Sequence, residues 1–153
     1  MNAFYRVFVM PLLIAVAVTQ GLRHPRKHLV VKAQPVLLSV LRIVTGFLFI
    51  EHGTQKWLLF PGGTTRATVE NLGGIAGIFE LVGGALIVVG LFTRPVAFVL
   101  SGLMAFAYFI AHAPQGFWPI LNKGELAVLY CFVFLYFSVA GAGAWSVDAM
   151  RRR

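Results

Sequence analysis

The stretch LGGIAGIFELVGGALIVVGLF, residues 72–92, carries only one ionisable side chain, the carboxylate of Glu80. A helix rises ~1.5 Å per residue, so about 20 apolar residues are enough to cross the ~30 Å hydrocarbon core of a bilayer. Unpaired backbone groups are costly in lipid, so such a segment is expected to be helical. A strand of a membrane barrel would alternate apolar and polar residues, which this stretch does not. The stretch therefore predicts a transmembrane helix.

Three other long apolar segments accompany it. Hydrophobic residues make up 59% of the 153 residues and charged residues only 12%, with a mean hydropathy of +0.83, a balance unlike that of soluble domains. The links between the segments are short and contain turn residues, as in PGGTT and TRP, so consecutive helices should lie antiparallel and adjacent. The sequence predicts an all-α, integral membrane four-helix up-down bundle. Its spans are expected at about 35–60, 72–92, 95–113 and 124–144.

The N-terminal extension, residues 1–34, contains an additional apolar segment at 7–18, which is interrupted by Pro11 and followed by the basic run RHPRKH. This segment is short for a span. Three interpretations stand: a helix lying on the membrane surface, a fifth span that would place the N-terminus outside, and a cleaved signal peptide. The four-helix membrane domain is expected at 35–148, followed by a basic tail at 149–153.

The formal net charge is +8, but the basic residues stand in short patches beside apolar spans and are not interleaved with exposed aromatic residues. We therefore expect no nucleic-acid partner and interpret the patches as topology signals, which mark cytoplasmic loops. On this basis the C-terminus, and the N-terminus of a four-span chain, should face the cytoplasm. The residues that carry this orientation are Arg23, Arg26, Lys27, Lys32, Arg94, Arg151, Arg152 and Arg153.

Small residues recur along one face of the second span. Gly73 and Gly77 are four residues apart, and Gly84 follows seven residues after Gly77. Such spacing lets neighbouring helix backbones approach closely in lipid. Glu80 shares this face, so its carboxylate should point toward a neighbouring helix and away from lipid.

The run IEHGTQKW, residues 50–57, places polar side chains near the outer end of the first span. His52 should lie ~12 Å below that end, and Glu80 should lie ~12 Å below the outer end of the second span. Lys56 is one turn beyond His52 on the same face, while Gln55 belongs to a parallel row. At the opposite end Arg42 sits two turns into the first span, where its long side chain is expected to snorkel or to pair inside the bundle.

The third span ends and the fourth begins at the same outer edge, so all four helices should contribute polar groups to one pocket. Charges in a membrane are costly, and we expect Glu80 to pair with Lys56 or His52, and Glu125 to pair with His112 or Lys56. The cluster either fixes helix register or forms a pocket for a small amphipathic molecule or for protons. A metal site is not expected, because no HxxH or HxxxH spacing exists. The candidate pocket residues are His52, Gln55, Lys56, Glu80, His112, Asn122 and Glu125.

Four motifs together resemble the DoxX family of small bacterial membrane proteins: LRIVTGFLFIEHGTQK, FELVGGALIVVGLFTR, AHAPQGFWPILNKGELAVLY and GAGAWSVD. The resemblance covers about residues 36–148 and implies a multi-pass bundle in the bacterial inner membrane. Glu51 and Lys123 depart from the family pattern, which commonly has an apolar residue and glycine there. The pattern falls on Arg42, His52, Gly53, Gln55, Lys56, Glu80, Gly83, Gly84, Thr93, Arg94, His112, Asn122, Gly124 and Glu125. Of these, Arg42, Arg94, Gly83 and Gly84, with Gly77, are expected to serve structure or topology.

Some members of this family are similar to the small membrane subunit of thiosulfate:quinone oxidoreductases, and others look like partners in redox defence. The resemblance implies an accessory or quinone-interacting subunit of a thiol, sulfur or oxidative-stress system, with quinone as the possible cofactor and a redox protein and lipid as partners. A non-catalytic carrier or scaffold is the alternative. Cys131 is the single cysteine, so the chain cannot form an intrachain disulfide. The catalytic residues and the oligomeric state, including a homo-oligomer, stay open.

Overall fold

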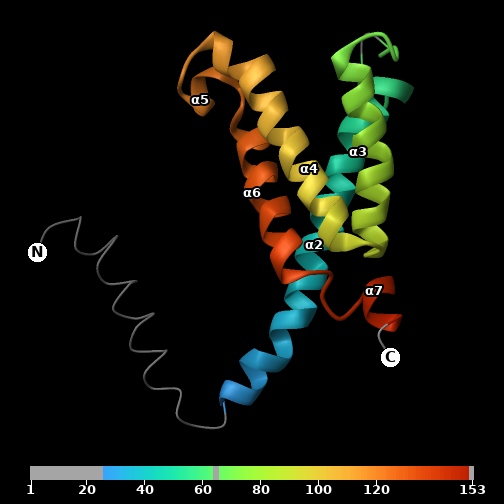
Figure 1. The fold of residues 1–153 in the computed structure, drawn as a ribbon, viewed down its shortest axis with the longest axis vertical. Coiled ribbons are helices and arrows are strands. Elements are labelled where there is room, and N and C mark those ends of the chain that lie inside the picture. The colour runs from blue at the N-terminus through green and yellow to red at the C-terminus, as the bar shows by residue number, and fades with distance from the viewer. Residues whose placement is uncertain (1–25, 64–65, 152–153) are drawn as a thin grey trace, which may run out of the picture. The chain divides into compact units, whose positions relative to one another are not determined.

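The computed structural model describes residues 26–63 and 66–151, and every regular element in those ranges is a helix (Figure 1). The all-α prediction is confirmed. The elements are α2 (Arg26–Leu58), α3 (Leu72–Val89), α4 (Thr93–Ala107), the π-helical turn η2 (Tyr108–His112), the 3₁₀ turn η3 (Ala113–Gln115), α5 (Pro119–Asn122), α6 (Glu125–Ala140) and α7 (Val147–Met150).

The chain divides into two compact units, residues 1–35 and 36–153. Of the first unit, only the beginning of α2 is described. The apolar segment predicted at 7–18 lies outside the described residues, so its three interpretations stay predictions. Helix α2 begins at Arg26, before the predicted start of the first span, and it includes Pro35. A proline inside a helix removes one backbone hydrogen bond, which a long helix can tolerate.

Within residues 26–63 and 66–151, three helical stretches are long and apolar enough to cross a membrane: Ala33–Leu58, Leu72–Val89 and Thr93–Gln115. The fourth apolar helix, α6, has 16 residues and extends for ~24 Å, which is less than predicted for 124–144. It ends at Ala140 because Gly141 has a φ of 88°, outside the helical region. The chain is a membrane protein, and its described part contains three helices long enough to span and one shorter apolar helix.

The four long helices pack in the order α2, α3, α4, α6, with α6 returning to α2. Phe49 of α2 contacts Phe134 of α6 at 4.9 Å between ring centroids, and the Ser101 hydroxyl of α4 donates to the Cys131 carbonyl of α6 at 2.9 Å. Consecutive helices run antiparallel (Figure 1). We call the end where α2 ends and α3 begins the pocket end, and the opposite end the Arg42 end. The buried core consists of Phe49, Ile87, Ala97, Leu100, Met104, Tyr130, Phe134 and Phe137.

The glycines of α3 permit close contact with both neighbouring helices. A Cβ atom on Gly84 would lie 2.7 Å from the Ile50 side chain and 3.1 Å from the Gly46 carbonyl oxygen, both of α2. A Cβ atom on Gly83 would lie 2.7 Å from the Leu100 side chain of α4. The prediction placed Gly73 on this packed face, but Gly73 is exposed and Gly74 is buried against the loop that precedes α3. At Gly74 the loop residue Thr68 is the nearest neighbour of the helix.

Arg42 is completely buried at the Arg42 end, so of the two expected alternatives its side chain binds inside the bundle and does not snorkel. Its guanidinium donates to main-chain carbonyls: Nε to Ala142 at 2.8 Å, one terminal nitrogen to Ile87 and Val88, and the other to Trp145 at 2.5 Å. Two of these carbonyls belong to the last turn of α3, where the chain ends the helical hydrogen-bond pattern and the Gly90 amide donates to Ile87 as well. A cation is favoured at a helix C-terminus, so Arg42 both caps α3 and holds the segment after α6.

Residues 141–148, GAGAWSVD, form a strap across the Arg42 end. The carboxylate of Asp148 accepts hydrogen bonds from the amides of Phe92 and Thr93, both at 2.9 Å, and so caps the start of α4. The Ser39 hydroxyl accepts from the Trp145 amide at 3.0 Å. Arg94, the predicted topology residue, is exposed beside this strap. The strap therefore joins the ends of α2, α3 and α4.

Candidate functional site

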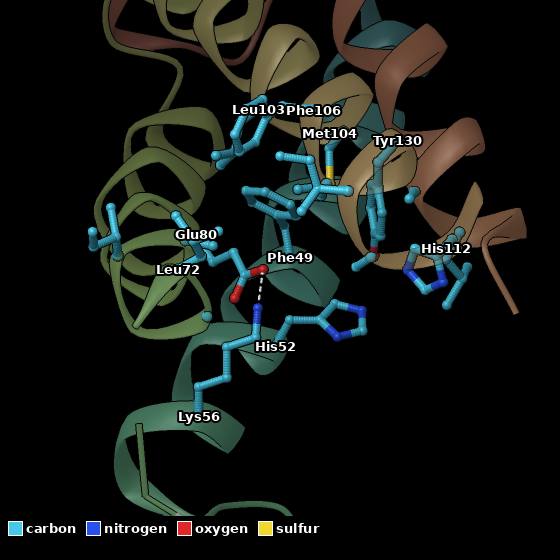
Figure 2. Close-up of a pocket in the computed structure, with 18 of the residues that line it drawn as sticks. Phe49, His52, Lys56, Leu72, Glu80, Leu103, Met104, Phe106, His112 and Tyr130 are labelled. Carbon is cyan, nitrogen blue, oxygen red and sulfur yellow. Dashed lines mark hydrogen bonds and ion pairs between the residues drawn. The ribbon is translucent and has the colours of Figure 1, made fainter. Parts of the chain in front are cut away.

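A cavity of about 500 Å³ lies at the pocket end, between the four long helices (Figure 2). Its wall is mainly apolar, with polar groups contributed by α2, α3, η2, α6 and the turn before α6. The lining residues are Phe49, His52, Lys56, Leu72, Gly73, Ile75, Ala76, Glu80, Leu103, Met104, Phe106, Ala107, Ile110, Ala111, His112, Lys123, Leu126, Ala127 and Tyr130.

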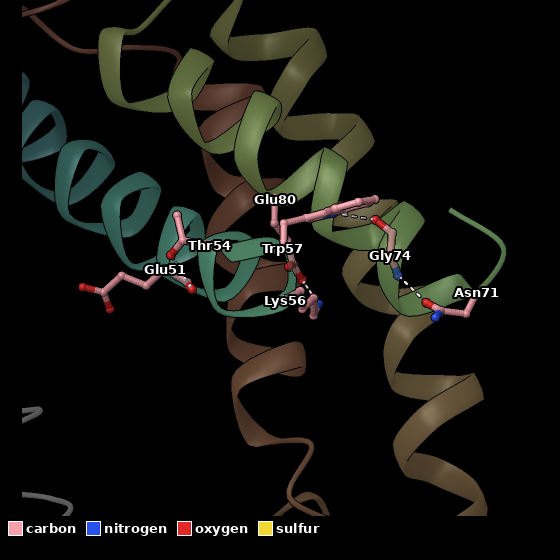
Figure 3. A network of polar contacts seen from close by, with 7 residues as sticks. All are labelled: Glu51, Thr54, Lys56, Trp57, Asn71, Gly74 and Glu80. Carbon is pink, nitrogen blue, oxygen red and sulfur yellow. Dashed lines mark hydrogen bonds and ion pairs between the residues drawn. The ribbon is translucent and has the colours of Figure 1, made fainter. Parts of the chain in front are cut away.

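Lys56 and Glu80 form an ion pair in this wall, with 2.5 Å between Nζ and Oε1 (Figure 3). The predicted pairing of Glu80 is confirmed for Lys56. The side chain of Glu80 is 5% exposed and that of Lys56 is 33% exposed, so the ammonium reaches down from the pocket end to a buried carboxylate. The pair offsets the cost of an isolated charge, which is about 2.5–3.5 kcal/mol at the centre of a membrane helix.

The second carboxylate oxygen, Oε2 of Glu80, is buried and accepts no hydrogen bond from any residue that the structure describes. Leaving a buried polar atom without a partner costs about 1–3 kcal/mol. Ion pairing with Lys56 satisfies only one of the two oxygens. The carboxylate thus retains one oxygen that no described residue uses as a hydrogen-bond acceptor.

His52 is half-buried and stands edge-on to the ring of Tyr130, with 6.0 Å between the centroids. Among the described residues, no side chain or main-chain group forms a hydrogen bond with the His52 ring. Figure 2 shows His52, Tyr130 and His112 on one side of the cavity and the Glu80–Lys56 pair on the other. The cavity therefore has an acceptor on one wall and groups able to donate on the facing wall.

The π-helical turn η2 brings His112 to the cavity. A π-helical turn is wider than an α-helical one and is frequent at functional sites. Nδ1 of His112 lies 3.0 Å from the Asn122 carbonyl oxygen, so this nitrogen is engaged in holding the loop and Nε2 is left for the cavity. His112 thus connects the cavity wall with the segment 116–124.

Asn122 is buried but is not part of the cavity wall. Its Nδ2 donates to the Gly116 carbonyl at 2.7 Å, and its Oδ1 accepts from the Gly124 amide at 2.8 Å. The amide nitrogen also donates to the Tyr108 hydroxyl at 3.4 Å, so both of its N–H groups and its oxygen are engaged around the 116–124 loop. The predicted pocket role of Asn122 is thereby replaced by a role in holding the loop.

Gln55 and Glu125 also lie outside the cavity wall. Gln55 is exposed and donates from Nε2 to the Pro61 carbonyl at 3.3 Å. Glu125 is exposed in the first turn of α6, where a carboxylate interacts favourably with the helix dipole. Its predicted pairing is wrong, because Lys56 binds Glu80 and His112 binds Asn122. In residues 26–63 and 66–151, no group of three His, Cys, Asp or Glu side chains could hold a metal ion.

Trp57 lies across the first turn of α3 next to the cavity. Its Nε1 donates to the Gly74 carbonyl at 3.1 Å, and Asn71 accepts from the Gly74 amide at 2.7 Å, which caps the helix (Figure 3). A Cβ atom on Gly77 would lie 2.8 Å from Nε1 of Trp57. Gly77 is therefore needed for the contact that orients Lys56 toward Glu80, in agreement with its predicted structural role.

Comparison with known proteins decides the family. The DoxX family pattern matches residues 37–113, half of the chain, and this match includes His52, Lys56, Glu80 and His112. The chain belongs to the DoxX family. The resemblance seen in the sequence motifs is confirmed.

The DoxX chain has relatives that it matches along most of their length. An uncharacterized protein of Haemophilus influenzae is 49% identical over 123 residues, which cover 76% of this chain and 92% of that protein. The inner membrane protein YphA of Escherichia coli is 30% identical over 132 residues, covering 76% and 91%. An uncharacterized membrane protein of Mycobacterium tuberculosis is 27% identical over 134 residues, covering 74% and 80%. No solved structure matches.

Two polar residues of this DoxX cavity were absent from the sequence prediction, Tyr130 and Lys123. The signal for Tyr130 was available, because Ala127, Tyr130 and Phe134 follow the i, i+3, i+7 spacing of one helix face, and all three are buried. No comparable signal marks Lys123. It occupies a left-handed turn with a φ of 60° just before α6, and only the folded loop brings it to the wall.

Proposed function

We propose that the cavity binds the head group of a hydroquinone or quinone, and that the protein is a quinone-interacting subunit of an inner-membrane redox system. The observation that carries this proposal is Oε2 of Glu80, a buried carboxylate oxygen without a donor among the described residues, on a side chain that lines a largely apolar cavity. The volume, about 500 Å³, lies in the range of ~300–1,000 Å³ that is usual for small-molecule sites.

The chemistry of the two walls suits both oxidation states of such a ligand. A hydroquinone hydroxyl would donate to Oε2 of Glu80, while a quinone carbonyl would accept from His52, Tyr130 or Lys56. When bound, the quinone supplies the electron chemistry, and the protein supplies position and proton partners. Lys56 reaches from the exposed end of the site to the buried carboxylate, so protons can be exchanged there without opening the apolar wall.

The electrons must come from a partner under this proposal. Cys131 is the single cysteine of the chain, and its main-chain carbonyl and sulfur both lie next to the Ser101 hydroxyl within the bundle. A dithiol or disulfide therefore requires a second protein. We propose a redox protein as that partner, with this chain holding the quinone.

We also propose that the pocket end faces the periplasm and the Arg42 end faces the cytoplasm. Exposed Arg94 and Arg151 lie at the Arg42 end. At the pocket end each exposed cation has an acidic residue nearby in sequence: Arg66 with Glu70, and Lys123 with Glu125. An excess of positive charge on one side marks the cytoplasmic side.

A non-catalytic scaffold is the second candidate. The ion pair between Lys56 of α2 and Glu80 of α3 favours it, because one buried pair between two helices fixes their register whether or not a ligand binds.

The two candidate functions differ in whether the protein binds a ligand through Glu80. We expect purified protein in detergent to bind a water-soluble hydroquinone, measured by isothermal calorimetry. Glu80→Gln should weaken this binding about tenfold or more, because a hydrogen bond to a charged acceptor contributes about 1.5–3 kcal/mol. The matched control is Glu51→Gln, because Glu51 is a half-buried carboxylate outside the cavity wall. This variant should bind the hydroquinone with the affinity of the natural protein. Equal affinity in Glu80→Gln and Glu51→Gln, or no binding by the natural protein, would favour the scaffold.

A further inference from the structure

We propose that the cavity opens sideways into the bilayer between α3 and α4, and that its ligand carries an apolar tail that lies in this opening. The inference rests on the proposed function, because it takes the head-group site at Glu80 as its starting point. It adds the class of ligand, a phenol or hydroquinone joined to a long alkyl or isoprenoid chain, and the route by which that ligand enters.

The polar and apolar parts of the cavity wall are separated. The groups that can bind a polar head come mainly from α2 and α6, together with Glu80. The wall formed by the first turns of α3 and the last turns of α4 is apolar, and it includes Ile75, Ala76, Phe106 and Ala107. A head group at Glu80 therefore has an apolar channel beside it.

The same apolar residues are also exposed on the outside of the bundle. Ile75 is 43% exposed, Phe106 is 54% exposed and Ile110 is 48% exposed, although all three line the cavity. On helices that span a membrane, exposed apolar side chains face lipid tails. The cavity wall and the lipid-facing surface are thus continuous between α3 and α4.

The arrangement of the two helices explains why the opening is at this place. Next to the short turn that joins them, α3 and α4 are in close contact, with Gly83 against Leu100. Toward the pocket end they diverge, as Figure 1 shows. Ala76 lies ~10 Å beyond Gly83 along α3, and small side chains at Ala76 and Ala107 leave the widening gap unfilled.

The free oxygen of Glu80 argues for an occupant whose head group can donate a hydrogen bond. A phosphodiester head group has no hydrogen to donate to Oε2. A neutral head with a hydroxyl satisfies that oxygen. The tail then extends from the head toward Ile75 and Phe106, where it meets the lipid.

The test uses full-length protein in nanodiscs and two ligands with the same hydroquinone head, one without a tail and one with a long alkyl tail. Ala76→Phe narrows the opening from α3. We expect it to weaken binding of the tailed ligand at least tenfold and to change binding of the tailless ligand less than twofold. Ala85→Phe is the matched control, since Ala85 is exposed on the same helix and does not line the cavity. It should leave both affinities unchanged.

A second variant, Ala107→Phe, narrows the opening from α4, so that the test does not depend on the folding of one protein. Melting temperatures identify the variants that fold. The opening is rejected if folded Ala76→Phe and Ala107→Phe both bind the tailed ligand as the natural protein does. In that case binding of the tailless ligand would still support the head-group site. Failure of the natural protein to bind either ligand would reject the head-group site and, with it, the opening.

Discussion

Two buried charged side chains, Arg42 and Glu80, differ in how completely their polar atoms are hydrogen-bonded. Arg42 is completely buried, and its hydrogen bonds go to four main-chain carbonyls of α3 and of the strap. Glu80 has one oxygen bound to Lys56 and one oxygen without a donor among the described residues. A satisfied charge stabilises a fold, whereas an unsatisfied one beside a cavity is a place for a ligand. We therefore assign Arg42 to structure and Glu80 to the site.

Replacing Arg42 should destabilise the protein strongly. Arg42→Met would remove the hydrogen bonds to four buried or part-buried carbonyls, and we expect a loss of about 3 kcal/mol or more in the free energy of unfolding. Arg94→Met is the matched control, because Arg94 is exposed and forms no such contacts, and its effect should be within about 0.5 kcal/mol. Thermal unfolding in detergent measures both. A similar, small loss for the two variants would contradict the role assigned to Arg42.

At the scale of the elements, close packing of α3 against α2 sets the position of Glu80 relative to Lys56. Gly46 and Gly53 of α2 face Gly84 and Gly77 of α3, and a Cβ atom at any of them would lie about 3 Å or less from an atom of the neighbouring helix. Helices in lipid gain little from hydrophobic association, so small residues that allow backbone contact hold them together. The ion pair depends on this contact.

A glycine comparison tests that contact. Gly84→Ala should lower the melting temperature, because the new methyl group would meet Ile50 and the Gly46 carbonyl, and overpacking typically costs about 1–3 kcal/mol. Gly102→Ala provides the control, since nothing lies within 4 Å of a Cβ atom there and alanine is the better helix former. We expect Gly102→Ala to be neutral or stabilising. If Gly84→Ala behaved in the same way, α2 and α3 would not depend on glycine contact.

At the scale of the whole molecule, one end of the bundle holds the helices together and the other end contains the cavity. The Arg42 end is closed by the strap, by the α3 cap and by the carboxylate of Asp148 at the start of α4. The pocket end holds the cavity and the loop that Asn122 closes. Rigid attachment at one end lets α3 and α4 diverge at the other without separating the helices.

The proposed orientation of these two ends can be measured by cysteine labelling in a Cys131→Ser background. Single cysteines in place of the exposed residues Thr68 and Gln115, both at the pocket end, should react with a membrane-impermeant thiol reagent added to intact cells. A cysteine in place of Met150, exposed at the Arg42 end, should react only after the cells are opened. The reverse pattern would invert the orientation and place the cavity on the cytoplasmic side.

Several features could be read from the sequence because they depend on local properties of the chain. The length and apolarity of the stretch at 72–92 predicted a spanning helix, since in lipid the backbone must satisfy its own hydrogen bonds. Equal distances from the helix ends predicted that His52 and Glu80 lie at the same depth, with Lys56 one turn from His52 as the other possible partner of Glu80. Glu80 pairs with Lys56. Glycine spacing predicted the packed face of α3, although it placed Gly73 there in error.

Other features were decided only by the tertiary structure, because they depend on helix rotation and loop closure. Tyr130 lines the cavity because of the way α6 is rotated about its axis where it packs against α2. Asn122 does not line the cavity because its amide oxygen and nitrogen both bind within the folded 116–124 loop. Glu125 does not line it because its side chain lies on the exposed side of the first turn of α6. The acceptors of Arg42 lie 45 to 103 residues away in sequence. Contacts over such separations depend on how the helices pack, which no pattern within a single helix encodes.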